Sequence, residues 1–151
     1  MAKFNFHAAV NLLLVWDNKI LLIKRANTSY FSEYYEGPAG HIDGNETVRE
    51  AMAREANEEV GIAIDPKDMV LVHIIHRYNK YKDGGEYFEF YLTADKWQGE
   101  PVNKEPEKCH EVGWFPLDTL PENMVPKTKH AIEQWRLGNV FSELDWENRI
   151  K

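Results

Sequence analysis

The stretch from Gly40 to Ile62, GHIDGNETVREAMAREANEEVGI, constrains this chain more than any other part of it. Residues Thr47 to Glu50 have the T-x-x-E form of a capping box, which predicts Thr47 as the N-cap of a helix. Gly61 stands where a residue in the left-handed conformation would end that helix. The residues between are good helix formers, and three of them are alanine. The stretch therefore predicts a loop, a helix and a stop.

This helix is expected to have one apolar and one acidic face. The apolar side chains that share one sector at 100° per residue are Met52, Ala53, Ala56 and Val60. Glu55, Glu58 and Glu59 share the opposite side, where like charges destabilise a bare helix by about 0.2–0.5 kcal/mol per pair. A tight cluster therefore needs a counter-charge, and Mg²⁺ is suitable because it binds carboxylate oxygens together with substrate phosphates. A solvated acidic face is the alternative interpretation.

The same stretch matches the pattern G-x5-E-x7-R-E-U-x-E-E-x-G-U at every fixed position, where U is aliphatic. If roughly one residue in fifteen fits each fixed position, chance gives such a match about once in 10⁸ windows. The stretch resembles the Nudix box, the signature of the Nudix hydrolases, although the small Ala56 replaces a usually bulkier aliphatic residue. The resemblance extends over about residues 5–138. It implies a single domain over residues 1–151 with an α/β Nudix fold, an α/β/α sandwich with a mixed sheet.

The resemblance also implies roles for the residues of the box. The metal ligands that it implies are Gly40, through its carbonyl oxygen, Glu55, Glu58 and Glu59. Glu55 is either a ligand or the general base. Arg54 would either orient Glu58 or form a structural pair with Glu46. Nudix enzymes cleave a nucleoside diphosphate linked to another group, and metal ions activate water and neutralise charge on the phosphate oxygens.

Side chains outside the box complete the expected site. Many members use a further carboxylate, for which Glu107 and Glu111 are the candidates. Lys24 and Arg25 end an apolar strand and could contact phosphates, although such residues often merely finish a strand at the surface. Tyr35 belongs to an aromatic loop that could stack on a base or could pack beneath the loop. The implied cofactor is Mg²⁺, with Mn²⁺ as a substitute.

The expected substrate is a small nucleotide. The segment Glu105–Cys109, followed by Trp114 and Phe115, resembles the MutT-like nucleoside triphosphate diphosphatases. A nucleoside or deoxynucleoside triphosphate, cleaved to the monophosphate and pyrophosphate, is therefore the first choice. ADP-ribose, a nucleotide sugar or a dinucleoside polyphosphate is the alternative. A non-catalytic nucleotide sensor is a third class, which the intact set of acidic residues in the box disfavours.

Composition limits the partners and the location. The net charge of -7 argues against binding to a nucleic-acid polymer, which usually needs a basic patch. Cys109 is the single cysteine, so no internal disulfide can form and a reducing compartment is expected. No apolar run is long enough for a membrane span, and no signal sequence is evident, so the cytoplasm is expected. Apolar residues in the tail, 139–151, should cover the domain or meet a second subunit in a homodimer.

The remaining elements follow from local patterns. The expected strands cover residues 8–16, 19–23, 69–78, 86–93 and 111–117. Asp17 and Asn18 form the turn of a first hairpin, and residues 83–85 form the turn of a second. Residues 99–109 are polar with two prolines and should form a loop, whereas residues 127–137 should form an amphipathic helix.

Overall fold

A computed structural model describes residues 1–81 and 84–150 of the chain. Its strands are β1 (His7–Leu12), β2 (Val15–Trp16), β3 (Lys19–Arg25), β4 (Tyr35–Glu36), β5 (Ala39–His41), β6 (Met69–Tyr78), β7 (Glu86–Ala94), β8 (Cys109–Pro116) and β9 (Phe141–Leu144). Its helices are α1 (Val48–Val60) and α2 (Pro126–Arg136), with short 3₁₀ turns at Pro66–Asp68 and Trp146–Asn148. Asp83, in the expected second turn, lies outside the described residues. No helix in the described part of the chain is long and apolar enough to cross a membrane.

The strands form two sheets. Within the described residues, a five-stranded sheet has the order β5-β1-β7-β6-β9. Its pairs β1/β7 and β6/β9 are parallel, and its other pairs are antiparallel, so the sheet is mixed as expected. The second sheet is antiparallel and is centred on β3, which pairs with β2, β4 and β8. The sequence predicted the mixed sheet, and the separate antiparallel sheet is an addition to that prediction.

The first predicted strand is divided between these sheets. Residues 8–16 were expected as one strand, but β1 ends at Leu12 and β2 begins at Val15. Leu13 and Leu14, both fully buried, carry the chain from one sheet to the other. The predicted turn at Asp17 and Asn18 is present, with φ angles of 51° and 56°. Positive φ at both positions matches the right-handed twist of a two-residue hairpin.

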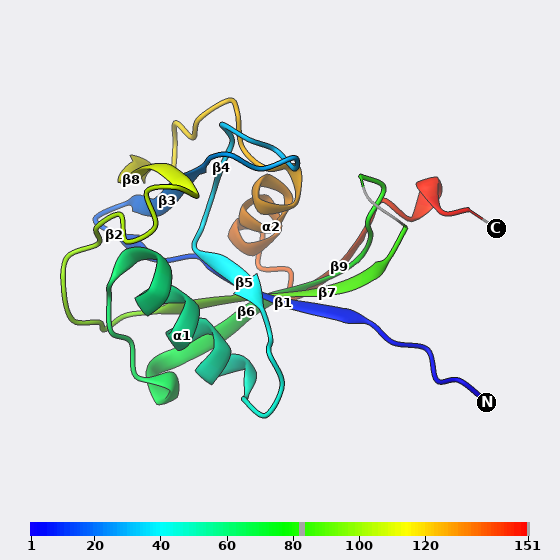
Figure 1. Ribbon diagram of the computed structural model, residues 1–151. Coiled ribbons are helices and arrows are strands. Elements are labelled where there is room, and N and C mark those ends of the chain that lie inside the picture. The colour runs from blue at the N-terminus through cyan, green and yellow to red at the C-terminus, as the bar shows by residue number, and fades with distance from the viewer. Residues whose placement is uncertain (82–83, 151) are drawn as a thin grey trace.

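The two helices cover opposite sides of the five-stranded sheet (Figure 1), which confirms the α/β/α sandwich. The buried residues of α1 are Ala51, Met52, Ala56 and Val60, and they pack in the same cluster as Leu12 and Leu92. Ala131 and Ile132 of α2 pack with Ile75 in a second cluster on the other side. Full burial of an aliphatic side chain contributes about 1.5–3 kcal/mol, so these two clusters hold the layers together.

The ends of α1 are fixed as the sequence predicted. The Thr47 hydroxyl accepts a hydrogen bond from the Glu50 N–H at 3.1 Å, and the Glu50 carboxylate accepts one from the Thr47 N–H at 2.8 Å. Gly61 adopts the left-handed conformation with φ 72°, and its N–H donates to the Asn57 carbonyl. Local interactions therefore define where the helix begins and ends.

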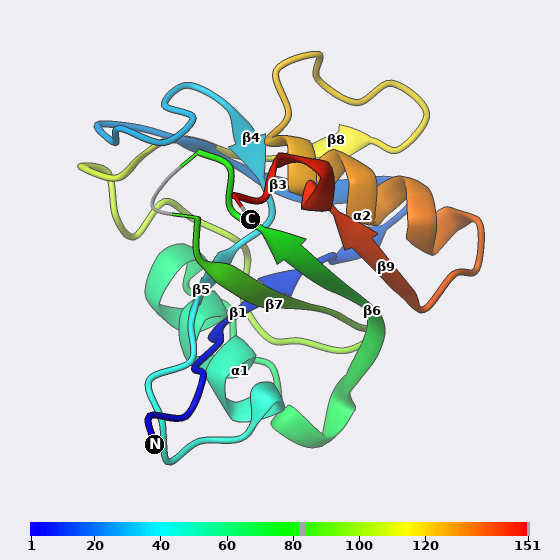
Figure 2. The same cartoon turned by 90° about the vertical axis from the view of Figure 1, so that its right-hand side faces the viewer.

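The C-terminal tail adds a strand that the sequence analysis missed. Strand β9 pairs in parallel with β6 at the edge of the five-stranded sheet (Figure 2). The tail therefore extends the sheet as well as covering the domain. Its four residues, FSEL, do not alternate between apolar and polar, so they give no period-two signal.

Candidate active site

Two glutamates of α1 face the backbone of β5. The Glu55 carboxylate lies so close to Gly40 that a Cβ atom at position 40 would collide with it. Glu59 is half-buried, and its Oε2 accepts a long hydrogen bond of 3.4 Å from the Ala39 N–H. Glu58, four residues after Arg54 on the helix, is exposed to solvent. Glycine at position 40 is therefore what allows the helix and the strand to bring these carboxylates against the backbone.

Arg54 connects this helix to the preceding loop. Its guanidinium donates two hydrogen bonds to Glu46, at 3.0 and 2.8 Å. The same group donates to Glu55 at 2.9 Å and to Glu58 at 3.4 Å. The hydrogen bonds from Arg54, and a further one from the Asp43 N–H, lower the pKa of Glu46 to about 2. Arg54 thus makes the expected pair with Glu46 and also contacts Glu58.

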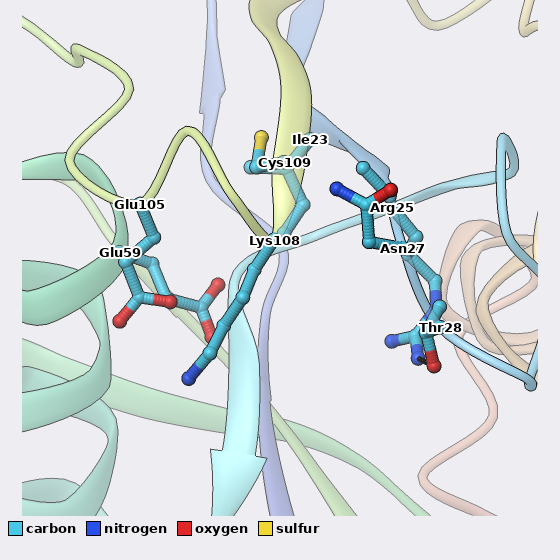
Figure 3. A pocket seen from close by; sticks show the side chains of 9 residues that line it. Ile23, Arg25, Asn27, Thr28, Glu59, Glu105, Lys108 and Cys109 are labelled. Atoms are coloured by element: carbon cyan, nitrogen blue, oxygen red, sulfur yellow. Dashed lines mark hydrogen bonds between the residues drawn. The ribbon is translucent and has the colours of Figure 1, made fainter.

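The loop before β8 brings in a fourth carboxylate. The Val102 N–H donates to the Val60 carbonyl at 3.0 Å, and the Lys104 N–H donates to the Glu59 carbonyl at 3.1 Å. These bonds satisfy carbonyls that the end of α1 would otherwise leave unpaired. They also hold Glu105 beside Glu59, where both line a cavity of about 320 Å³ (Figure 3). We refer to Glu55, Glu58, Glu59 and Glu105 as the carboxylate cluster.

Glu105 was missed although its segment had been singled out. The sequence analysis chose Glu107 and Glu111 as the carboxylates outside the box. Glu107 is exposed, and its carbonyl accepts a hydrogen bond from the Asn27 side chain. The hydrogen bonds from Val102 and Lys104 to the end of α1 determine which residue of the loop faces the cavity. Contacts between such distant segments produce no repeating pattern in the sequence. The one feature of the sequence that could have indicated Glu105 is its position as the first residue of the E-P-E-K-C segment.

Negative charge in the carboxylate cluster is only partly compensated. Burial, followed by the charges of Glu36 and Glu55, raises the pKa of Glu59 well above its ordinary value. Burial also raises the pKa of Glu55, although Arg54 opposes this effect. A divalent cation would supply the missing charge, and the oxygen donors present are those that Mg²⁺ prefers. The residues therefore fit such an ion.

The arrangement is open on the side of the cavity. Within residues 1–81 and 84–150, no three acidic, histidine or cysteine side chains converge closely enough to enclose a metal ion. In phosphate-handling sites Mg²⁺ commonly keeps several waters and takes further oxygens from the substrate.

Arg25 lines the same cavity from the end of β3, opposite Glu59 and Glu105 (Figure 3). Its guanidinium donates to the buried Glu36 at 2.6 Å and to the Tyr30 carbonyl at 2.9 Å. Arg25 therefore reaches the predicted site, but its guanidinium is already bound by groups of the chain.

Three other expected site residues lie on the opposite face of the β3 sheet. Lys24 is directly opposite Tyr35 on one neighbouring strand and Glu111 on the other, so the three side chains share one face. The Tyr35 hydroxyl donates to Glu111, and Lys24 pairs with Glu33 at 3.6 Å. Tyr35 belongs to the core cluster beneath α2. The structure thus does not bring these three residues to the carboxylate cluster.

A second group of charged residues surrounds Glu89 of β7. Glu89 is fully buried and lines, with Gly40, a cavity of about 160 Å³. It accepts hydrogen bonds from Arg77 at 2.9 Å, Lys127 at 3.0 Å and Asn11 at 2.9 Å. Burial alone would raise the pKa of Glu89, but Lys127 and Arg77 outweigh it and hold the pKa below its ordinary value. We refer to these four residues, Asn11, Arg77, Glu89 and Lys127, as the Glu89 cluster.

Known proteins are similar to this chain in sequence and in fold. The chain is 32% identical over 97 residues to the 8-oxo-dGTP diphosphatase of Escherichia coli strain K12, a match that covers 64% of this chain and 71% of that protein. It is 42% identical over 114 residues to the ADP-ribose pyrophosphatase of Methanocaldococcus jannaschii, covering 76% of this chain and 64% of that protein. The chain therefore spans less than two thirds of the length of that second relative.

A solved structure agrees with these sequence matches. A MutT NUDIX hydrolase from Burkholderia pseudomallei superimposes with a TM-score of 0.76 and 30% identity, covering 87% of this chain and 98% of that one. These relatives confirm the predicted similarity to MutT-like proteins. A model of the NUDIX domain matches residues 5–135. The box, the fold and this match together show that the chain belongs to the Nudix family of hydrolases, which act on phosphoanhydride bonds of nucleotides and generally use divalent cations.

Proposed function

We propose that the chain uses Mg²⁺, with Mn²⁺ as a substitute, to hydrolyse a nucleoside or deoxynucleoside triphosphate to the monophosphate and pyrophosphate. The observation that carries the proposal is the undercompensated carboxylate cluster at the edge of a cavity large enough for phosphate groups. The similarity to an 8-oxo-dGTP diphosphatase of Escherichia coli supports a triphosphate as the substrate.

In this proposal Glu58, Glu59 and Glu105 hold the cation, together with the carbonyl oxygen of Gly40. The bound cation would neutralise charge on the phosphate oxygens and lower the pKa of a water. Gly40 has no side chain, so its contribution is the backbone carbonyl oxygen. The same absence of a side chain lets Glu55 pack against it.

Glu55 is the proposed general base. Its Oε1 is held by Arg54, which leaves Oε2 to accept a proton from the attacking water. Burial raises the pKa of Glu55, which makes its carboxylate a stronger base. As the water oxygen bonds to one phosphorus of the α–β anhydride, the bond from that phosphorus to the bridging oxygen breaks. The bridging oxygen leaves with the other product, the monophosphate or the pyrophosphate, and carries the negative charge. Arg54 positions both Glu55 and Glu58 through its guanidinium.

ADP-ribose is the second candidate. The observation in its favour is the 42% identity to the ADP-ribose pyrophosphatase of Methanocaldococcus jannaschii. A nucleotide sugar or a dinucleoside polyphosphate would need the same chemistry at the carboxylate cluster and would differ in the group linked to the diphosphate. A nucleotide sensor without turnover would bind these compounds and release no product.

A substrate screen in Mg²⁺ tests the proposal. The common and oxidised nucleoside triphosphates are compared with ADP-ribose, nucleotide sugars and dinucleoside polyphosphates, and phosphate is measured separately from pyrophosphate. We expect the highest kcat/KM for a triphosphate, with pyrophosphate as the product. A preference for ADP-ribose or a nucleotide sugar of about tenfold, or 1.4 kcal/mol of transition-state binding, would contradict the choice of substrate. Binding without any turnover would identify a sensor.

The cytoplasmic location and a homodimer stay predictions from the sequence. A small nucleotide is the expected partner, with neither a nucleic-acid polymer nor a membrane involved.

A further inference from the structure

The cavity beside the carboxylate cluster should offer the substrate a cation from the chain itself. A triphosphate carries more negative charge than one divalent cation neutralises. Of the basic residues expected to help, Lys24 lies on the opposite face of the sheet and pairs with Glu33. Arg25 lines the cavity, but Glu36 binds its guanidinium at 2.6 Å. Neither residue is free to meet the phosphates.

Lys108 lies where such a cation is needed. It lines the cavity with Glu59 and Glu105, and Figure 3 shows its side chain running toward those carboxylates, with Arg25 on the other side of the cavity. Among the residues that the structure describes, none forms an ion pair with Lys108, in contrast to Lys24 and Arg25. Its ammonium group therefore keeps its hydrogen-bonding capacity for a ligand.

The backbone around Lys108 is held in place. The Lys108 N–H donates to the Glu105 carbonyl at 2.9 Å, and the Lys108 carbonyl accepts from the Ala26 N–H at 2.9 Å. The Asn27 side chain donates to the neighbouring Glu107 carbonyl at 2.8 Å. The start of the side chain is thus fixed at the cavity wall, whereas its flexible stem can adjust to the ligand.

We propose that Lys108 binds a phosphate oxygen of the substrate in this cavity. This inference rests on the proposed function, since it needs a substrate with phosphate groups at the carboxylate cluster. An ammonium bound to a phosphate oxygen forms a charge-assisted hydrogen bond, which is stronger than a neutral one. Lys108 holds the substrate and transfers no proton.

Three variants test the role of Lys108. Lys108→Ala removes the cation, and Lys108→Arg restores a positive charge. Lys104→Ala is the matched control, because Lys104 is an exposed lysine of the same loop whose side chain lies over Gly61. Both positions are at the surface, where substitutions usually change stability by less than about 0.5 kcal/mol.

The probe is inorganic pyrophosphate in the presence of Mg²⁺, with its Kd measured by calorimetry beside kcat and KM for the best nucleotide. We expect Lys108→Ala to weaken pyrophosphate binding and raise KM by roughly tenfold, as for loss of a hydrogen bond to a charged group. Lys108→Arg should recover most of this loss, and Lys104→Ala should stay within about twofold of the wild type.

The outcomes separate this inference from the proposed function. Triphosphate turnover with unchanged pyrophosphate binding in Lys108→Ala would overturn the role of Lys108 alone. Weaker pyrophosphate binding in Lys108→Ala, without triphosphate turnover by the wild type, would support Lys108 and overturn the choice of substrate. Failure of the wild type to bind pyrophosphate with Mg²⁺, or an equal loss in Lys104→Ala, would also overturn the inference.

Discussion

Glu59 is half-buried and Glu89 is fully buried, and the charges that surround them differ. Glu89 accepts hydrogen bonds from Arg77, Lys127 and Asn11, and its pKa is held below the ordinary value. Glu59 accepts one long hydrogen bond from Ala39, and its pKa is raised well above the ordinary value. The chain thus completes the Glu89 cluster by itself and leaves the carboxylate cluster incomplete.

This difference separates a structural charge from a functional one. A buried charge that has lost its hydration is costly unless it is paired and hydrogen-bonded. Arg77 and Lys127 provide that pairing for Glu89. Among the described residues no cationic side chain pairs with Glu59, and a divalent cation shared with phosphate groups would supply that partner.

Removal of divalent cations should have the largest effect. In excess chelator we expect hydrolysis of any nucleotide to fall by more than about 10³-fold, because neither the water nor the phosphates would be polarised. Circular dichroism should show the fold retained, since the Glu89 cluster needs no metal. Turnover at the full rate in chelator would contradict the claim that the carboxylate cluster around Glu59 needs a divalent cation.

Glu59→Gln should affect activity and spare the fold. We expect kcat to fall by at least about 10²-fold, as for other positioned charge stabilisers. The free energy of unfolding without metal should not fall, because the substitution removes a charge that the protein does not compensate. Kinetics with saturating Mg²⁺ and urea unfolding with chelator measure the two effects. An active Glu59→Gln variant would indicate a merely solvated acidic face.

Glu89→Gln should show the reverse pattern. The substitution leaves Arg77 and Lys127 as buried cations without their carboxylate, which costs about 3 kcal/mol at the lower end for a broken buried pair. For a domain of this size, Tm should fall by about 6–12 °C. Glu100→Gln, at an exposed position, is the matched control and should leave Tm nearly unchanged. If Glu89→Gln is as stable as the wild type, the Glu89 cluster does not contribute the expected pairing.

The smallest expected effect is stabilisation by the cation. At a Mg²⁺ concentration ten times its Kd, linkage adds about 1.4 kcal/mol, or about 3–6 °C in Tm. Glu59→Gln should lose this shift, whereas Glu89→Gln should keep it from a lower starting Tm. A shift that is equal in the wild type and in Glu59→Gln would place the bound cation elsewhere.

The sequence predicted what depends on local interactions. The capping box at Thr47, the stop at Gly61 and the turn at Asp17 and Asn18 each lie within a few residues, and each is present. The spacing of the box glutamates likewise follows from the period of one helix. These features needed no knowledge of which distant segments meet.

Features that depend on distant contacts were missed or misplaced. Glu105 reaches Glu59 because its loop hydrogen-bonds to the end of α1. Lys24 and Tyr35 face away from the carboxylate cluster, because neighbouring residues on a strand point to opposite faces of the sheet. The pairing of β3 with β4 and β8 determines that their face is the one beneath α2. Glu89 of β7 forms ion pairs with Arg77 on the neighbouring strand β6 and with Lys127 at the start of α2. No local pattern in the sequence predicts these long-range contacts.

Direct binding of a divalent cation tests the central claim, that the carboxylate cluster is completed by a metal ion. Mn²⁺ is titrated into metal-free wild type, Glu59→Gln and Glu89→Gln, and bound ion is followed by calorimetry and electron paramagnetic resonance below the Tm of each variant. We expect saturable binding to the wild type, binding to Glu59→Gln weaker by about tenfold or more, and binding to Glu89→Gln within about twofold of the wild type. Equal affinity of the wild type and Glu59→Gln, or a loss confined to Glu89→Gln, would contradict the claim.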